Sequence, residues 1–130
     1  MQEIRSNHIG GVLMALLAAF LMLDAGLKLA GAEVAISATA ELGFSAPATR
    51  LLGGVLALAM LAYLVPVTRV LGAILLTGYF GGAIAIQAQQ NSPLFSHILF
   101  GSYAGVILWG SIWLRSPVVR SLIPMQRREV

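Results

Sequence analysis

Two ionisable residues interrupt the first long apolar stretch of the chain, where charge is costly if the stretch lies in a membrane. Asp24 and Lys28 are four residues apart, so in a helix they share one face and can form an ion pair. A carboxyl group beside an ammonium group can act as a general acid or base. The spacing equally suits a structural pair, in which Lys28 extends to the membrane surface and Asp24 neutralises it. The sequence leaves both interpretations open.

Further polar side chains fall near the same membrane level when the chain is traced through four spans. Gln87 lies at the outer end of the third apolar segment, and Tyr79 lies two turns earlier on roughly the same face. His97 opens the fourth segment, also at the outer end. We therefore predict a polar cluster in which the candidate catalytic residues are Asp24, Lys28 and His97. The candidate ligand-binding residues are Tyr79, Gln87, Tyr103 and Glu41.

Several other kinds of site lack the residues that they need. The chain has no cysteine, which excludes disulfides, thiolate nucleophiles, iron–sulfur clusters and cysteine zinc sites. Its two histidines, His8 and His97, are expected on opposite sides of a membrane about 30 Å thick, which disfavours haem ligation and a two-histidine metal site. Glycine-rich phosphate loops and a nucleophile elbow are absent. We predict no metal and no cofactor, except a quinone under one alternative given below.

The composition indicates which solvent surrounds the elements that carry these residues. Of the 130 residues, 58% are hydrophobic and 10% are charged, whereas soluble domains have about 45–50% and about 25%. Mean hydropathy is +0.89. Four spans of roughly 20 residues each would use about 80 residues and leave only short loops. We therefore predict a single all-α domain over residues 1–130, an integral membrane four-helix bundle.

Four apolar segments predict the transmembrane helices. The first is longer than the roughly 7–15-residue apolar core of a signal peptide, so it is predicted to be a retained helix. Ser45 is a suitable N-cap for the second, with Pro47 in its first turn. Residues 30–46 suit an interfacial loop or a short surface helix, and residues 115–130 form a basic cytoplasmic tail. The predicted spans are about 9–29, 47–65, 70–88 and 94–114.

The distribution of basic residues predicts an orientation with both ends of the chain in the cytoplasm. Lys28 and Arg50 fall on one side of the membrane. Cytoplasmic loops carry the excess of lysine and arginine, so the opposite side, with six arginines, is predicted to face the cytoplasm. The predicted membrane is a bacterial inner membrane. This explains the net charge of +3 without nucleic-acid binding, which needs a different arrangement of basic and aromatic residues. The inside residues are Arg5, Arg69, Arg115, Arg120, Arg127 and Arg128.

Small residues recur at four-residue spacing in the third and fourth segments. The pairs are Gly78 with Gly82 and Gly101 with Gly105. Such spacing lets transmembrane backbones approach closely. We expect these two helices to pack closely through these positions, and the alternative is that one of the faces forms a homodimer.

The sequence resembles the DoxX-like family of four-helix membrane proteins over most of its length. Residues 24–29 (Asp-Ala-Gly-Leu-Lys-Leu) carry the first part of the likeness. It returns in residues 42–44 (Leu-Gly-Phe), in the long block 63–79, and in residues 93–97 (Pro-Leu-Phe-Ser-His). The long middle block is the most specific part.

The resemblance implies an intramembrane polar site on the residues that match the family pattern, namely Asp24, Lys28, Gly78 and His97. Two departures matter. Gln87 and Gln89 stand where the family has a histidine and a basic residue, so the usual proton carrier is missing. Gly101 stands where the family has proline. The bundle is also similar to sterol isomerase and ligand-binding proteins of the EXPERA type.

The family name comes from subunits that resemble parts of thiosulfate:quinone oxidoreductase, but a shared fold does not fix function. Our main hypothesis is a site for a lipophilic small molecule, with acid–base isomerisation, cyclisation or epoxide opening of an isoprenoid-like or polyketide-like substrate. The first alternative is a quinone-linked membrane subunit of an oxidoreductase complex, since a lone oxidoreductase would need a bound quinone, a flavin or a partner. The second is a non-catalytic assembly or interaction protein.

Overall fold

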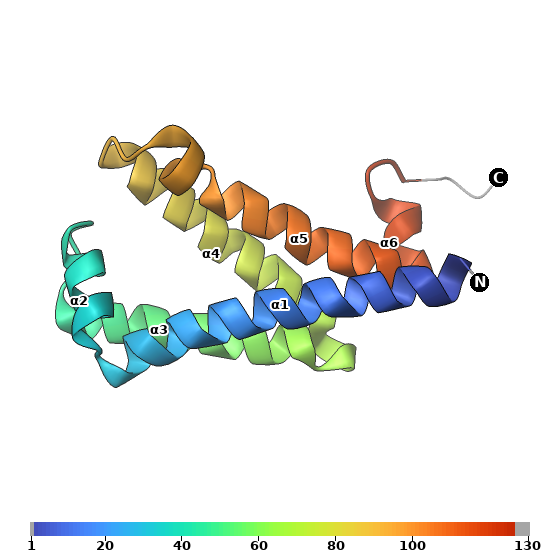
Figure 1. Ribbon diagram of the computed structural model, residues 1–130, viewed down its shortest axis with the longest axis horizontal. Helices are drawn as coiled ribbons and strands as arrows, with labels where there is room; N and C mark the ends of the chain where they lie inside the picture. The colour runs from blue at the N-terminus through green and yellow to red at the C-terminus, as the bar shows by residue number, and fades with distance from the viewer. Residues whose placement is uncertain (1, 127–130) are drawn as a thin grey trace.

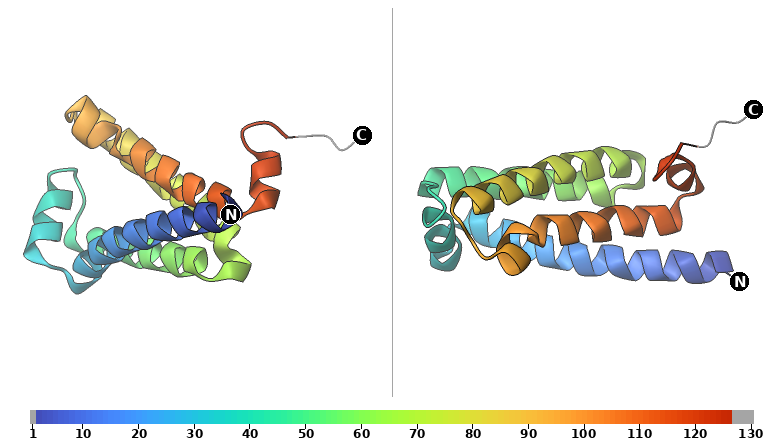
Figure 2. Two further views of the ribbon diagram at one scale, coloured as in Figure 1. Left: turned by 45° about the vertical axis from the view of Figure 1, so that its right-hand side comes forward. Right: turned by 90° about the horizontal axis from the view of Figure 1, so that it is seen from above.

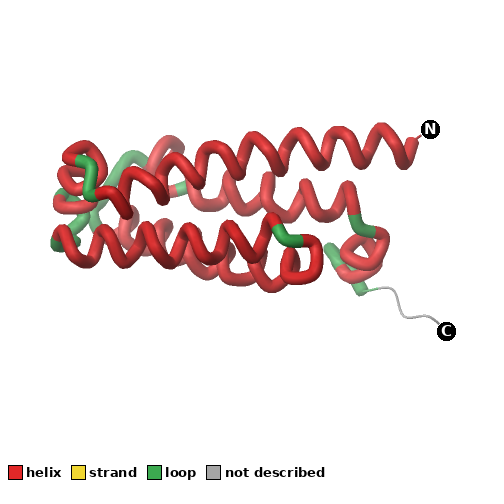
Figure 3. Tube along the Cα trace, turned by 90° about the horizontal axis from the view of Figure 1, so that it is seen from below, coloured by secondary structure: helices red, strands yellow, loops and turns green. Residues whose placement is uncertain are grey.

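The computed structural model describes residues 2–126, and four long helices dominate it (Figure 1). No strand occurs in this part of the chain, and helices make up nearly all of it (Figure 3). The long helices are α1 (Gln2–Ala30), α3 (Ala46–Leu64), α4 (Arg69–Gln89) and α5 (Phe100–Arg115). The short elements are α2 (Glu33–Ala40), the 3₁₀ turn η1 (Pro66–Thr68), the π-helical turn η2 (Leu94–Ile98) and α6 (Pro117–Leu122).

The prediction of an all-α protein with four membrane-spanning helices is confirmed. Large apolar side chains also cover the outside of the bundle, and Leu16, Leu58 and Val106 are more than half exposed. A soluble protein rarely presents so much contiguous apolar surface to water, whereas lipid solvates it. The four helices that are long and apolar enough to cross a membrane are Gln2–Ala30, Ala46–Leu64, Pro66–Gln89 and Leu94–Arg115.

Local sequence signals set the helix ends. The Ser45 hydroxyl accepts a hydrogen bond from the backbone N–H of Ala48 at 3.3 Å and caps α3, as expected. Pro66 cannot continue α3 and begins the η1 turn. Gly31, with φ of +69°, ends α1 in a conformation that glycine adopts without strain. Residues 33–40 form the short helix α2, one of the two forms expected for this connection.

The long helices form a four-sided bundle. Helices α1 and α4 each pack against both α3 and α5, so α1 and α4 are diagonally opposite and do not pack against each other. Both ends of the described chain lie at one end of the bundle, which we call the terminal end, and α2 lies at the other, which we call the α2 end (Figures 1 and 3). Figure 2 shows α4 and α5 diverging from α1 and α3 toward the α2 end.

The core fills the bundle toward the terminal end. Its fully buried large side chains come from α3, α4 and α5, and α1 adds Met14, Leu17 and Leu21. The Tyr63 hydroxyl is hydrogen-bonded to the Ser111 hydroxyl at 2.6 Å, so this buried polar pair is satisfied. The largest fully buried side chains are Tyr63, Leu56, Met60, Leu76, Leu108 and Ser111, together with Thr49 in the first turn of α3 at the α2 end.

The expected packing through glycine pairs is mostly wrong. A Cβ atom at Gly72 would overlap the backbone of Tyr63, and one at Gly101 would lie 2.8 Å from the carbonyl oxygen of Phe80. These two glycines therefore mark the close crossings of α4 with α3 and with α5. The spacing rule identifies only Gly101. No neighbouring heavy atom lies within 4 Å of a Cβ built at Gly78, Gly82 or Gly105.

Candidate functional site

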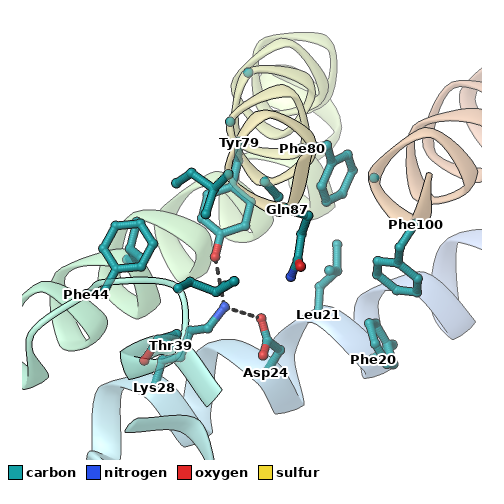
Figure 4. A pocket seen from close by; sticks show the side chains of 17 residues that line it. Phe20, Leu21, Asp24, Lys28, Thr39, Phe44, Tyr79, Phe80, Gln87 and Phe100 are labelled. Atoms are coloured by element: carbon teal, nitrogen blue, oxygen red, sulfur yellow. Dashed lines mark hydrogen bonds and ion pairs between the residues drawn. The ribbon is translucent and has the colours of Figure 1, made fainter. Parts of the chain in front are cut away.

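A cavity of about 420 Å³ lies between the long helices toward the α2 end, where α4 and α5 diverge from α1 and α3 (Figure 4). Small-molecule sites typically have volumes of about 300–1,000 Å³ and mainly apolar walls. The walls come from all four long helices, from Thr39 of α2 and from the segment after α2. Four of the five phenylalanines of the chain line it, namely Phe20, Phe44, Phe80 and Phe100. We call this space the aromatic cavity.

The ion pair expected from the spacing on α1 lies in the wall of the aromatic cavity. The Lys28 Nζ atom donates a hydrogen bond to Asp24 Oδ2 at 2.7 Å and a second to the Tyr79 hydroxyl oxygen at 3.0 Å. The ammonium group also lies 5.6 Å from the centre of the Tyr79 ring. Three polar groups therefore form one continuous chain, which Figure 4 shows as dashed lines.

This hydrogen-bonded chain bridges the diagonal of the bundle. Lys28 belongs to α1 and Tyr79 to α4, which are diagonally opposite and do not pack against each other. Toward the terminal end, core side chains fill the space between these helices. Toward the α2 end, where the helices diverge, the polar groups of Lys28 and Tyr79 meet across that space. The Asp24 side chain remains 39% exposed, so its carboxylate is accessible from the cavity.

A second, more polar hollow of about 450 Å³ lies under α2, and we call it the vestibule. Glu41 and His97 line the vestibule and not the aromatic cavity, and His97 Nδ1 is hydrogen-bonded to the Ser96 hydroxyl at 2.7 Å. Ser92 and Pro93 complete its rim beyond α4. Five residues line both hollows, which therefore adjoin: Asp24, Lys28, Thr39, Leu42 and Gln87.

The structure brings six of the seven candidate residues to these two adjoining hollows. Tyr103 is the exception, because it lines neither hollow and is 46% exposed. It follows Gly101, a cavity residue, by two positions, which is a rotation of about 200° around the helix. Its side chain therefore points away from the site. The six are Asp24, Lys28, Tyr79, Gln87, Glu41 and His97.

Two features of the site were missed from sequence. The first is Thr39, whose buried hydroxyl is hydrogen-bonded to that of Thr49 and so fastens α2 to α3. The second is the aromatic wall. Phe20 precedes Asp24 and Lys28 at the same four-residue step, so the sequence did contain a signal that it shares their helical face. The partners of Thr39 and of the other phenylalanines depend on tertiary packing.

The site contains proton donors, proton acceptors and one ammonium group around an apolar space. Within residues 2–126 no three His, Asp or Glu side chains cluster in a way that could hold a metal ion. The arrangement can hold a lipophilic molecule, exchange a proton with it at Asp24, and stabilise negative charge on it through Lys28 and Tyr79.

Comparison with known proteins identifies the family. The model of the DoxX-like family matches residues 12–111, a range that includes every residue lining the aromatic cavity and the vestibule. No curated protein and no solved structure matches the chain. The four membrane-capable helices agree with the four-helix membrane fold that the resemblance implies. The chain therefore belongs to the DoxX-like family and is an integral membrane protein.

Proposed function

We propose that the aromatic cavity binds a lipophilic small molecule and that Asp24 performs acid–base chemistry on it. The reaction is an isomerisation, cyclisation or epoxide opening of an isoprenoid-like or polyketide-like substrate. One observation carries the proposal: the chain from Asp24 through Lys28 to Tyr79 lies in the wall of an apolar cavity of about 420 Å³. A carboxylate in the membrane is costly and is typically functional when it faces such a cavity.

Each polar group has a distinct role in the proposed reaction. Asp24 takes a proton from the substrate or returns one to it, which is the usual role of a positioned carboxyl group. Lys28 keeps the carboxylate oriented, and its ammonium group stabilises negative charge that develops on a substrate oxygen. Tyr79 contributes a hydroxyl at the same point. His97 lies in the vestibule, where it can exchange protons between water and the site.

The aromatic walls support this chemistry in two ways. They give the reacting atoms an apolar surrounding on the cavity side, which strengthens electrostatic interactions there. They also hold a flexible hydrocarbon in a limited number of conformations, which favours ring closure or migration of a double bond. A purely structural ion pair would need neither a cavity nor aromatic walls.

The direct test is turnover by the purified protein in lipid nanodiscs. Wild-type protein is incubated with a panel of isoprenoid and polyketide epoxides, dienes and enones, and products are identified by liquid chromatography and mass spectrometry. Asp24→Asn keeps the shape of the side chain but cannot titrate, so the rate should fall about 10²–10⁴-fold. Glu33→Gln removes a carboxylate that lines neither hollow, and it should leave the rate unchanged.

Two outcomes would contradict the proposal. Folded Asp24→Asn protein with wild-type turnover would remove Asp24 from the mechanism. A quinone that copurifies reproducibly with the wild-type protein would instead favour a quinone-linked subunit of an oxidoreductase complex.

A further inference from the structure

The aromatic cavity and the vestibule differ in chemistry although they adjoin. Four phenylalanines line the cavity, whereas the vestibule contains Glu41, Ser92 and His97. The Asp24–Lys28 pair belongs to both linings and therefore lies at their boundary. A ligand that contacts this pair can extend into both hollows at once.

We infer that the ligand is an amphipathic molecule with an uncharged, hydrogen-bonding headgroup in the vestibule and its hydrocarbon chain in the aromatic cavity. This rests on the proposed function, because it specifies the substrate class of the same site. The headgroup is of the hydroxyl type, as in a long-chain or isoprenoid alcohol. The reacting bond then lies near the headgroup, beside Asp24.

Hydrogen-bonding capacity supports placing the headgroup in the vestibule. The Gln87 amide both donates and accepts, and the Ser92 hydroxyl does the same. Both residues line the vestibule. In Figure 4 the Gln87 side chain extends from α4 toward the Lys28–Asp24 pair. A hydroxyl in the vestibule would keep partners there, but in the aromatic cavity it would lose most of them at a cost of a few kcal/mol.

Charge selects the kind of headgroup. The vestibule has two carboxyl groups, those of Asp24 and Glu41, and one ammonium group, that of Lys28. Lys28 is already hydrogen-bonded to Asp24 and to Tyr79. With His97 neutral, the formal charge of the lining is negative, so a fatty-acid carboxylate meets net repulsion. An uncharged hydroxyl does not.

Two glycines of α4 leave room in the cavity for the hydrocarbon chain of the ligand. Gly78 and Gly82 line the aromatic cavity, and a Cβ at either would have no neighbouring atom within 4 Å. The rings of Phe20 on α1 and Phe100 on α5 also line the cavity; their centres lie 5.6 Å apart, and both side chains are about half exposed. The hydrocarbon chain therefore extends from the Asp24–Lys28 pair toward these two rings.

Photolabelling with two isomeric probes tests this orientation in nanodiscs. Both are long-chain primary alcohols with a diazirine, which is next to the hydroxyl in the head probe and near the chain end in the tail probe. Labelled residues are mapped by proteolysis and mass spectrometry, with excess unlabelled alcohol as competitor. The head probe should label residues 35–42 and 92–97, and the tail probe residues 20–21, 78–86 and 100–101.

Matched variants test whether the probes occupy the cavity. Gly82→Leu fills the part of the aromatic cavity that the hydrocarbon chain would occupy. The labelling that excess unlabelled alcohol suppresses should then fall about tenfold for both probes. Gly78→Leu should act in the same way if Gly82→Leu protein is poorly folded. Gly81→Leu is the control, because Gly81 also has no neighbour within 4 Å but lines neither hollow.

A carboxylic-acid analogue of the head probe tests the choice of headgroup. It should label wild-type protein less than the alcohol does, and Glu41→Gln should reduce the difference. Stronger labelling by the acid than by the alcohol would overturn the inference, as would head and tail probes that label the same residues or exchange places. Those results would leave the proposed ligand site standing. If neither probe labels either hollow of the wild-type protein in a way that excess unlabelled alcohol suppresses, the proposed function itself is contradicted.

Discussion

At the scale of single residues, the polar groups inside the bundle are matched in pairs and short chains. The Lys28 ammonium has two side-chain partners, and the hydroxyls of Tyr63 and Ser111 are hydrogen-bonded to each other in the core. In residues 2–126 no buried side-chain nitrogen or oxygen lacks a hydrogen-bond partner. Because each buried group is satisfied, none adds the cost of an unpaired donor or acceptor, and the Asp24 carboxylate stays exposed to the cavity.

The balance between Asp24 and Lys28 predicts how stability responds to their substitution. Lys28→Met alone leaves the Asp24 carboxylate without its cationic partner, and breaking a buried pair costs about 3–5 kcal/mol, with less expected here because Asp24 is partly exposed. Lys28→Met with Asp24→Asn removes both charges and should restore most of the stability. Thermal unfolding of the detergent-purified variants measures this, and equal melting temperatures for the single and double variants would contradict it.

Some of the site could be predicted from sequence because it depends on local spacing. Asp24 with Lys28, and Tyr79 with Gln87, share helical faces at steps that any α-helix enforces. No such spacing relates Tyr103 to the other candidate residues, and its side chain points away from the site. The place of Thr39 in the site could not be predicted from sequence, because its partner, the Thr49 hydroxyl on α3, lies beside it only after folding.

At the scale of elements, the close helix crossings depend on which glycine faces a neighbouring backbone. All four long helices are apolar nearly all round, because their outer faces meet lipid. Hydrophobic periodicity therefore does not tell the packed face from the exposed face. The four-residue spacing of Gly78 and Gly82 predicts a packing face, but these two glycines line the cavity. The crossing lies two turns earlier, at Gly72.

Substitution by alanine distinguishes these two kinds of glycine. Gly72→Ala places a Cβ against the backbone of Tyr63, so α3 and α4 must separate, and overpacking of this kind costs about 1–3 kcal/mol or more. Gly78→Ala meets open space and gains helix propensity of up to about 1 kcal/mol. The melting temperature should fall for the first variant and hold or rise for the second. The reverse order would show that α4 is rotated relative to this structure.

At the scale of the whole molecule, the connections explain why the bundle is closed at one end and open at the other. At the terminal end, the four-residue connection 65–68, which contains η1, joins α3 to α4. Arg69 donates to the carbonyl oxygens of Tyr63 and Leu64 at 3.1 and 3.2 Å. The Ser6 hydroxyl there donates to the carbonyl oxygen of Leu114 at 2.6 Å. At the α2 end the connections are longer, so the helices can diverge around the cavity.

The count of helices could be predicted from hydropathy alone, since each apolar segment has the length of one span. The divergence of α4 and α5 from α1 and α3 could not be predicted. It depends on how far apart the long α2 connection and the η2 turn allow the helix ends to lie, and no single segment encodes that distance.

The orientation in the membrane is a further proposal about the whole molecule, and the arginines at the terminal end carry it. Arg5, Arg69, Arg115 and Arg120 belong to helix ends that meet there (Figure 1), while Arg127 and Arg128 lie outside the described residues. We propose that this end faces the cytoplasm of a bacterial cell and that the α2 end faces outward, following the positive-inside rule. Arg69 serves the fold as well, so its presence at this end is not a topological signal alone.

Because the chain has no cysteine, single introduced thiols report this orientation without background. Val67→Cys lies in η1 at the terminal end, and Gln90→Cys follows α4 at the α2 end; both positions are exposed. In intact cells a membrane-impermeant maleimide should label Gln90→Cys and should reach Val67→Cys only after permeabilisation. A reporter fused after residue 130 should read cytoplasmic, which ties the chain terminus to the Val67 side. Labelling of Val67→Cys but not Gln90→Cys in intact cells would show the opposite orientation. The vestibule, with Glu41 and His97, would then lie on the cytoplasmic side.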